Sequence, residues 1–497
     1  MSAPSFPDTV FSLCPVNNVA ISIVTGVSFT NLSYDSRGGP RLEFGYRWTS
    51  QDRNPLLTFA TVGSLGRQVD VYDSTGVLAP VHCAFVVNYK TGVLLVEDRS
   101  NGLTQICPRH GETFASFIRT KEGWPRVAIV DGINSYILLG DADGPQAKFF
   151  VDVHKSPDQI LDHVQRRMAA LDLATRRKCL RTYPGQTPAP EGVRILHHPL
   201  QELGRGGFGR VMKTVDLYSG DFLAVKVLAR PRDPQKYANW VKSVKMARER
   251  EVATMRRISH PYVVRYLGSQ GWSTSNVEIF MAMKRGSLYN LVDRHQNPQE
   301  LVGRIANPVT LQILSALDCL AFNRLVHRDV KPDNILWEFD ERGDYVFKLA
   351  DFGLANDEAR ARSISGTVGY AAPEIWERGR QSPKVDMWSF FVTLMWLIEP
   401  DFRSWVDDGE ARAIHRAVIQ AAIYDVRFRN TREMAIYDPG LRSSAAHFLA
   451  NVFQRPSYLT TPIADIPKRH PDHFDLWIRS VYDGSSPYSQ AIKDIMP

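Results

Sequence analysis

The most informative stretch of the chain is His327-Arg328-Asp329-Val330-Lys331-Pro332-Asp333-Asn334, which is followed downstream by Asp351-Phe352-Gly353. Asp329 can accept the proton of an attacking hydroxyl, and Lys331 can neutralise negative charge on a phosphoryl group in transfer. Asn334 and the aspartate of the second motif offer the oxygen ligands that magnesium prefers. Either motif alone is a weak signal, but the two in this order indicate phosphoryl transfer from a magnesium nucleotide.

A glycine-rich segment lies upstream, with the sequence Leu203-Gly204-Arg205-Gly206-Gly207-Phe208-Gly209-Arg210-Val211. Glycines allow a backbone to close over nucleotide phosphates, but the same pattern can open a dinucleotide-binding fold. That alternative needs a helix directly after the glycines, whereas residues 211–216 have a strand pattern, 218–221 a turn and 223–227 a second strand. The context therefore predicts an ATP site formed by Leu203, Gly204, Arg205, Gly206, Gly207, Phe208, Gly209, Val211, Ala224 and Lys226.

A basic helix is predicted over residues 236–258. Its inner stripe, at steps of three or four, comprises Val244, Ala247, Glu251, Met255 and Ile258. A glutamate on an inward-facing stripe needs a cation, and Lys226 is the candidate, whereas Glu249 is an alternative that lies off the stripe. The lysines and arginines at 242–257 are interpreted as the outer face of this helix and not as a nuclear localisation signal.

Two further motifs complete the set: Gly366-Thr367, and Ala372-Pro373-Glu374, which closes the segment that Asp351 opens. In this order the motifs resemble those of eukaryotic protein kinases, over about residues 195–460. Lys331 after the aspartate, together with Gly366-Thr367, resembles the serine/threonine branch.

The resemblance implies an α+β bilobal kinase fold, with ATP and Mg²⁺ as cofactors and serine/threonine hydroxyls of proteins as acceptors. It implies catalytic roles for Asp329, Lys331, Lys226 and Glu251, and metal binding by Asn334 and Asp351. It also places Arg455 as the partner of the Glu374 carboxylate. The competing hypothesis is a pseudokinase whose kinase fold is only a scaffold, but the intact lysine, aspartates and asparagine argue against it.

Arg328 leaves a positive charge near the activation segment, which a phosphate could neutralise and thereby order. Ser363 and Ser365 are the hydroxyls in reach, and arginines flank them. We hypothesise that one of them is phosphorylated, and the alternative is two solvated loop serines.

The first third of the chain alternates apolar and polar positions between turn residues. Residues 84–88 and 93–96 flank Tyr89-Lys90-Thr91-Gly92 as a hairpin, and further strands are predicted at 19–23, 126–130 and 148–153. The pattern predicts an all-β sandwich over residues 8–155.

Within that region, Gly66-Arg67, His82 and Asp98-Arg99-Ser100-Asn101-Gly102 resemble a forkhead-associated (FHA) domain. The resemblance implies binding of a phosphothreonine peptide, with Arg67 at the phosphate, Asn101 at the peptide backbone and His82 as a structural brace. The whole chain then resembles FHA-containing checkpoint kinases, an arrangement that some fungal kinases share. However, Ala79 and Pro80 stand where the family has a serine and a basic residue, so a purely structural domain remains the alternative.

The joint at 156–194 combines an amphipathic helix (158–180) with a proline-rich linker. A connecting helix packed on a neighbouring domain is the main interpretation, and a calmodulin-type target helix is the alternative. Residues 461–497 form a C-terminal tail to which the sequence assigns no role.

The formal net charge of +7 is interpreted as spread over the chain, which does not favour nucleic acid as a partner. The five cysteines are scattered without a CxxC pair, and residues 1–16 lack the features of a secretory signal. The most apolar run, 390–398, is too short to cross a bilayer and predicts a buried helix. We therefore expect an intracellular protein of the cytoplasm or nucleus, without a membrane partner.

Overall fold

The computed structural model describes most of the chain and forms two compact units. Unit 1 comprises residues 1–203 and 212–223, and unit 2 comprises residues 204–211 and 224–497. The described residues are 4–26, 32–46, 57–65, 69–107, 124–131, 133–141, 143–171, 194–206, 209–273, 276–340, 342–357, 366–377, 379–468, 470 and 472–495.

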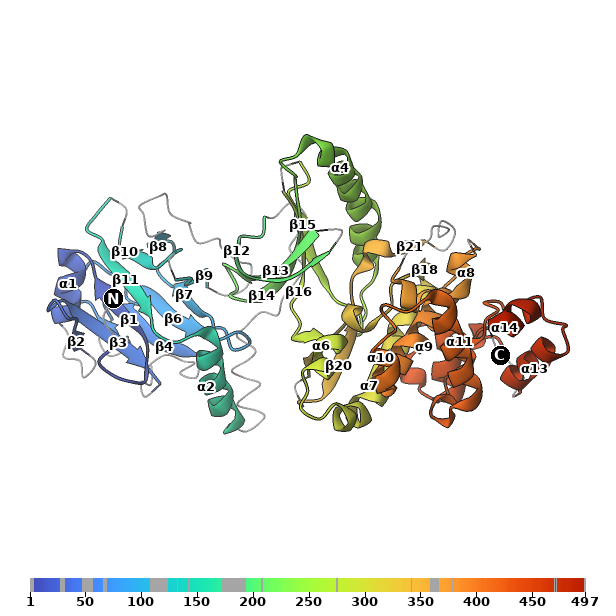
Figure 1. The fold of residues 1–497 in the computed structure, drawn as a ribbon. Coiled ribbons are helices and arrows are strands. Elements are labelled where there is room, and N and C mark those ends of the chain that lie inside the picture. The colour runs from blue at the N-terminus through green and yellow to red at the C-terminus, as the bar shows by residue number, and fades with distance from the viewer. Residues whose placement is uncertain are drawn as a thin grey trace. The chain divides into compact units, whose positions relative to one another are not determined.

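Two β-sheets dominate unit 1 (Figure 1). In the described part of the chain, one sheet has the strand order β2-β3-β1-β11-β10-β8 and the other β5-β4-β6-β7-β9. Their bounds are β1 Thr9–Pro15, β2 Leu32–Tyr34, β3 Pro40–Gly45, β4 Thr58–Gly63, β5 Val71–Tyr72, β6 Cys83–Val87, β7 Leu94–Asp98, β8 Thr104–Cys107, β9 Arg126–Ala128, β10 Tyr136–Leu139 and β11 Ala147–Val153.

The two sheets of unit 1 share one hydrophobic core. Phe11 on β1 stacks on Phe85 of β6, with ring centroids 4.9 Å apart, so the facing sides of the sheets are in contact. The predicted hairpin is present as β6–β7, with Val86 opposite Leu95. The region is therefore β-rich, as the sequence predicts.

The predicted strand at 19–23 is wrong, because these residues lie in helix α1 (Asn18–Thr25). The side chain of Asn17 caps the helix by accepting the Ala20 N–H at 3.0 Å. Burial of Ala20, Ile23 and Val24 follows a helical spacing. Capping and packing here outweigh the strand preference of a β-branched run.

Helix α2 (Pro157–Ala169) begins with a capping box between Ser156 and Gln159. Its apolar side chains Ile160, Val164 and Met168 are buried in the core of unit 1. This placement supports the interpretation as a packed connecting helix. Helix α2 ends at Ala169, before the predicted end at residue 180, and residues 172–180 lie outside the described residues.

Unit 1 also contains residues 212–223, which comprise most of strand β13 (Gly209–Asp216), the turn after it and the first two residues of strand β14 (Phe222–Ala229). Asn88 Nδ2 donates to the carbonyl of Ser219 at 2.9 Å, and Thr91 Oγ1 donates to the carbonyl of Gly220 at 2.7 Å. Val215 packs in a buried cluster with Ala84, Val86, Val93, Leu95 and Ala128. The β13–β14 turn and the end of β13 are therefore attached to the N-terminal domain by these hydrogen bonds and by a small apolar cluster that is separate from the core between the two sheets.

In the described residues, the strands of the second half form a sheet with the order β12-β13-β14-β16-β15, and two smaller sheets with the orders β17-β19-β20 and β18-β21. The predicted hairpin after Asn334 is present as β19–β20. Further bounds are β12 His197–Gly206, β15 Tyr266–Gln270, β16 Asn276–Ala282, β17 Gly286–Ser287, β18 Leu325–Val326, β19 Ile335–Phe339, β20 Tyr345–Leu349 and β21 Asn356–Asp357.

The predicted basic helix is continuous from α4 (Tyr237–Met246) through the π-helical turn η3 (Ala247–Val252) to α5 (Ala253–Arg257). We call residues 237–257 helix C. Its two halves differ, since α4 has no buried residue whereas η3 and α5 bury Ala247, Glu251, Val252, Thr254 and Met255.

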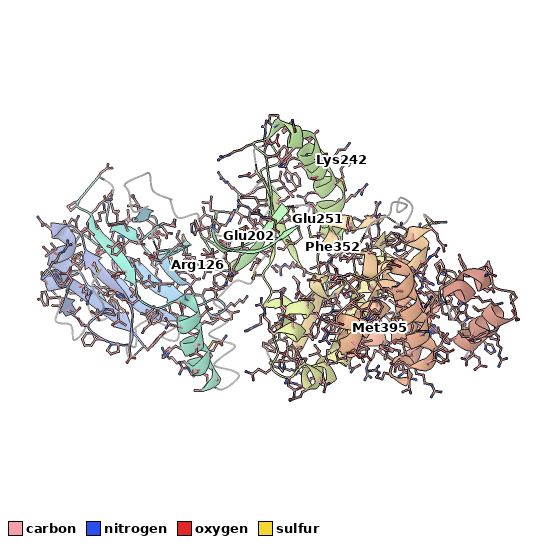
Figure 2. All side chains as sticks on the ribbon, in the orientation of Figure 1. Arg126, Glu202, Lys242, Glu251, Phe352 and Met395 are labelled. Atoms are coloured by element: carbon pink, nitrogen blue, oxygen red, sulfur yellow. The ribbon has the colours of Figure 1, made fainter. Side chains whose placement is uncertain are left out.

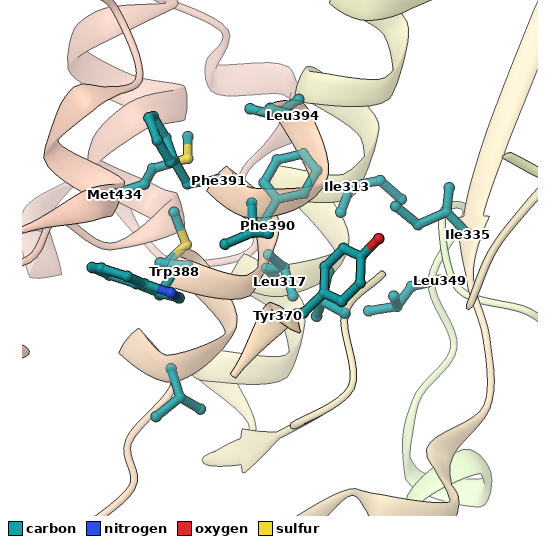
Figure 3. Packing of buried hydrophobic residues seen from close by; sticks show 14 of the residues in the cluster. Ile313, Leu317, Ile335, Leu349, Tyr370, Trp388, Phe390, Phe391, Leu394 and Met434 are labelled. Atoms are coloured by element: carbon teal, nitrogen blue, oxygen red, sulfur yellow. The ribbon is translucent and has the colours of Figure 1, made fainter. Parts of the chain in front are cut away.

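The C-terminal part of unit 2 is helical, with α9 (Lys384–Ile398) at its centre. Nearly every side chain of α9 is buried, which confirms the predicted core helix at 390–398. Figure 3 shows Phe390 and Leu394 of α9 packed near Ile313 and Leu317 of α7 (Pro298–Phe322). The remaining helices are α6 Leu288–Asp293, α8 Pro373–Trp376, α10 Pro400–Arg403, α11 Ala411–Tyr424, α12 Ala445–His447, α13 His473–Tyr482 and α14 Ser489–Ile495.

Among the described residues, α7 alone is long and apolar enough to cross a membrane by length and composition. Its most apolar window is 72% buried inside the protein, as expected for the core helix of a folded domain.

Candidate active site

Lys226 on β14 and Glu251 on η3 form a buried ion pair. The ammonium of Lys226 lies 2.8 and 2.9 Å from the two carboxylate oxygens of Glu251 and 3.3 Å from Asp351 Oδ1. The alternative candidate, Glu249, has a 62% exposed side chain and lies 3.9 Å from Lys245. The structure thus places Glu251, and not Glu249, against the lysine.

The charges at this point stabilise one another. Burial alone lowers the pKa of Lys226, but the carboxylates of Glu251 and Asp351 raise it above its ordinary value. Burial likewise raises the pKa of Asp351, but the Lys226 ammonium and the Gly353 N–H lower it overall. Lys226 is therefore an ammonium and Asp351 a carboxylate at neutral pH.

The π-helical turn η3 explains how helix C presents Glu251. A π-turn contains one extra residue compared with an α-turn, so it rotates the side chains on one side of it relative to those on the other. Within η3, Ala247, Glu251 and Val252 are buried, whereas Arg248 and Glu249 are exposed. The turn directs the carboxylate toward β14 while the preceding α4 stays at the surface.

The catalytic loop, residues 327–334, is held through its backbone by Asp386 at the start of α9. Asp386 accepts the N–H of His327 at 2.8 Å and that of Arg328 at 2.7 Å. Asp386 is 1% exposed, and Arg328 has a φ of 72°, a left-handed conformation that these two bonds maintain. The sequence interpretation gave Asp386 no role, although an acidic residue opening an apolar helix is a detectable signal.

Asp329 lies in a compact network with Lys331, Asn334 and Thr367. Asn334 Nδ2 donates to Asp329 Oδ2 at 2.8 Å, and Thr367 Oγ1 donates to Asp329 Oδ1 at 2.9 Å. The ammonium of Lys331 donates to Thr367 Oγ1 at 2.6 Å and lies 3.4 Å from Asp329 Oδ2. These four side chains come from the two motifs at 327–334 and 366–367, and the structure brings them into contact.

Asp351 and Phe352 complete the centre. Asp351 has a φ of 60° and accepts the Gly353 N–H at 3.2 Å. Phe352 is fully buried against the His327 ring, with centroids 5.0 Å apart. This packing turns the Asp351 carboxylate away from the core, leaving 49% of the side chain exposed.

The residue set fits a magnesium nucleotide. The amide nitrogen of Asn334 is used by Asp329, which leaves its carbonyl oxygen as an acceptor, and Asp351 offers a half-exposed carboxylate. Both are hard oxygen donors of the kind Mg²⁺ prefers. The buried Lys226 ammonium beside Asp351 is a suitable contact for nucleotide phosphates.

The glycine-rich segment joins β12, which ends at Gly206, to β13, which begins at Gly209. After the glycines, β13 runs to Asp216, a turn with Gly220 at a φ of 68° follows, and β14 begins at Phe222. This confirms the predicted strand-turn-strand over residues 211–227 and differs from the helix that a dinucleotide fold requires. Gly209 has a φ of 131°, and a Cβ there would lie 2.6 Å from the Val227 carbonyl, so glycine is required. Gly207 and Phe208 lie outside the described residues.

The predicted pairing of Arg455 with Glu374 is wrong. Glu374 is paired with Arg442, whose Nη1 and Nη2 lie 2.7 and 3.1 Å from the two carboxylate oxygens. Arg442 is fully buried and donates further to the carbonyls of Ile436, Tyr437 and Lys384, whereas Arg455 is exposed. Counting forward from the motif misplaced the arginine because the helical region between them has no fixed spacing.

Of the other candidates, Arg67, Ser363 and Ser365 lie outside the described residues. Asn101 has a φ of 65° and an exposed side chain in the turn after β7, a turn in which Asp98 accepts the Ser100 and Gly102 N–H groups. His82 is buried, with Nδ1 accepting the Ala79 N–H at 3.1 Å and Nε2 3.1 Å from the Leu103 carbonyl. His82 thus braces two loops of the N-terminal domain.

Residues 197–459 match the protein kinase domain, which is more than half of the chain. The chain belongs to the protein kinase family. The kinase match begins after the β-rich N-terminal domain, which lies outside it.

Curated relatives of the kinase are similar over the same part. A mitogen-activated protein kinase kinase kinase, mkh1, of Cytospora mali is 32% identical over 228 residues, covering 44% of this chain and 12% of that protein. The putative CBL-interacting protein kinase 27 of Oryza sativa is 34% identical over 203 residues, covering 39% of this chain and 47% of that protein. The match of this chain therefore spans less than half the length of these relatives.

Proposed function

We propose that the chain transfers the γ-phosphoryl group of ATP to serine or threonine hydroxyls of protein substrates. The observation that carries the proposal is the presence of both side-chain networks: the charged Lys226, Glu251 and Asp351 in one, and Asp329, Lys331 and the amide of Asn334 in the other. A relative named as a CBL-interacting serine/threonine-protein kinase, of Arabidopsis thaliana, supports the acceptor class.

Each residue has a role that its contacts support. Lys226, fixed by Glu251, holds the nucleotide phosphates, and Asn334 and Asp351 hold magnesium, which supplies charge neutralisation when bound. Asp329 orients the acceptor hydroxyl and accepts its proton. The ammonium of Lys331 lies 2.6 Å from the Thr367 hydroxyl, next to Asp329. There its positive charge can neutralise the phosphoryl group in transfer.

The test is phosphate transfer from radiolabelled ATP to a mixed serine/threonine protein substrate by the purified full chain. Asp329→Asn is expected to lower kcat by about a thousandfold or more while nucleotide binding persists. Asp340→Asn, at an exposed hairpin turn, is the matched control. Equal activity of Asp329→Asn and the control would refute the proposed reaction.

We further propose that the N-terminal domain binds a phosphothreonine peptide. The left-handed, exposed Asn101 and the His82 brace beside it support the proposal, because they offer a rigid polar turn at the surface. Titration of a phosphothreonine peptide library should show binding that Arg67→Ala and Asn101→Ala weaken. The absence of binding by the wild-type chain would leave the domain a structural role.

We also propose that phosphorylation of Ser363 or Ser365 activates the kinase. Arg328 is 3% exposed, and burial, followed by the positive charge of Arg250, lowers its pKa. A phosphate nearby would stabilise the charged guanidinium. Ser363→Ala/Ser365→Ala should lower activity and remove a phosphopeptide from mass spectra, and unchanged activity would contradict the proposal.

The free cysteines Cys14, Cys83, Cys107 and Cys319 support our expectation of an intracellular, reducing location.

A further inference from the structure

The N-terminal half of helix C, α4, lies mostly at the surface and contacts the main core of the kinase through the partly buried Val244. No residue of α4 is buried, and its Tyr237 and Val241 side chains are 41% and 44% exposed. These two positions are four apart, so they share one face of the helix. Trp240, which donates to the Leu228 carbonyl at 3.1 Å, attaches α4 to the sheet at a different position.

The positive charge of the chain is concentrated in two segments, residues 166–181 and residues 230–250, each with a net charge of +5. The second segment surrounds α4 and contains seven lysines and arginines and two acidic residues. The interpretation of an even charge distribution is therefore wrong. The cations in this segment are Arg230, Arg232, Lys236, Lys242, Lys245, Arg248 and Arg250.

The two acidic residues of this segment do not neutralise it. Asp233 lies 3.9 Å from Lys236 and Glu249 lies 3.9 Å from Lys245, and all four side chains are 45% exposed or more. Exposed ion pairs at such distances contribute little. Figure 2 shows Lys242 on the projecting part of the helix, whereas Glu251 lies near Phe352 at its base.

We infer that the face of α4 formed by Tyr237, Val241, Lys242 and Lys245 docks an acidic protein segment that also carries apolar side chains. The positive charge selects the acidic partner by complementarity. The exposed Tyr237 and Val241 add apolar area beside the charge, which backbone phosphates of a nucleic acid would not use. A helix of ten residues with two exposed apolar side chains is too small an anchor for a membrane surface.

The inference concerns binding and does not depend on phosphoryl transfer. The probe is a fluorescent glutamate–tyrosine copolymer, titrated into the purified full chain at two salt concentrations and followed by anisotropy. Polyglutamate, a single-stranded oligonucleotide and phosphatidylserine vesicles are the comparison ligands.

Lys242→Gln/Lys245→Gln is expected to weaken copolymer binding about tenfold, and high salt should reduce the difference. Val241→Ser should weaken copolymer binding about threefold but leave polyglutamate binding unchanged. Arg412→Gln/Arg416→Gln on α11 removes the same charge from another exposed helix, and should change affinity less than about twofold.

Two results would overturn the inference. One is an equal loss of copolymer affinity in the α11 double variant, because binding would then follow net charge and not this face. The other is tighter binding of the oligonucleotide or the vesicles than of the copolymer, with no effect of Val241→Ser. Thermal unfolding of each variant checks that these surface changes leave the fold intact.

Discussion

The catalytic loop and helix C bring charges to the same centre but are held in different ways. The loop is fixed through its backbone, because the buried Asp386 carboxylate accepts two of its N–H groups and His327 contacts the Ala350 carbonyl. Helix C is fixed through side chains, by the Glu251 ion pair and the Trp240 hydrogen bond, and through its buried C-terminal half. The loop therefore depends on the helical region through Asp386, whereas helix C depends on one ion pair, one hydrogen bond and the packing of its own C-terminal half.

We expect the largest effect on stability at the buried ion pair between Glu374 and Arg442. Arg442→Met leaves Glu374 buried without its partner, and we expect a loss of about 3–5 kcal/mol in the unfolding free energy of unit 2. Urea denaturation with tryptophan fluorescence measures it. Arg455→Met, at an exposed arginine, is the control and should lower the unfolding free energy by less than about 0.5 kcal/mol. An equal loss in the two variants would contradict the pairing of Glu374 with Arg442 alone.

A smaller effect is expected at the loop itself. Asp386→Asn keeps the shape but weakens two charge-assisted hydrogen bonds, and we expect about 2–3 kcal/mol lower stability together with lower kcat. Asp340→Asn is the matched control, because Asp340 also accepts two backbone N–H groups, at 2.8 and 2.9 Å, but at an exposed turn. Loss of activity without loss of stability would mean that the loop is not held by the fold.

At helix C we expect a substitution to lower activity with little effect on stability. Glu251→Gln removes the charge that fixes Lys226, so kcat/KM is expected to fall about 10- to 100-fold while the melting temperature changes by only about 2 °C. Glu249→Gln, two residues away and exposed, should leave kcat/KM unchanged. A large fall in the melting temperature of Glu251→Gln would contradict the distinction between loop and helix.

The smallest effect concerns His260, where the chain leaves helix C. The Tyr262 N–H donates to Nδ1 of its ring at 3.3 Å, and Nε2 lies 3.4 Å from Ser315 Oγ on α7. Burial lowers the pKa of His260 to about 4. Below pH about 6.5 the unfolded chain binds a proton that the folded chain does not, so stability falls as the pH drops from about 6.5 towards 4.

His260→Gln should make the unfolding free energy less dependent on pH between 7 and 5. Urea denaturation at both values measures the slope. His470→Gln, with a 61% exposed side chain, serves as control and should leave the slope unchanged. If His260→Gln left the slope unchanged, the pH dependence of stability would not come from the lowered pKa of His260.

Short-range patterns predicted the centre well, because each functional group lies in a motif whose spacing is set by tight local geometry. Asp329, Lys331 and Asn334 lie within six positions, and helical periodicity was enough to select Glu251 over Glu249. Arg442 was missed because its distance from Glu374 depends on the packing of several helices. Helix α1 was missed because the cap from Asn17 outweighed a β-branched run. The π-turn in helix C has no sequence signature that periodicity can detect.

The contact between Asn88, Thr91 and the β13–β14 turn affects whether the kinase segment can fold without the N-terminal domain. The family match, 197–459, separates Val215 from the residues Ala84, Val93 and Leu95 that cover it. Transplanting only the matched residues into another protein would leave an apolar strand without its cover and a turn without two of its hydrogen bonds. Val215 and the β13–β14 turn therefore need residues of the N-terminal domain for their burial and hydrogen bonds.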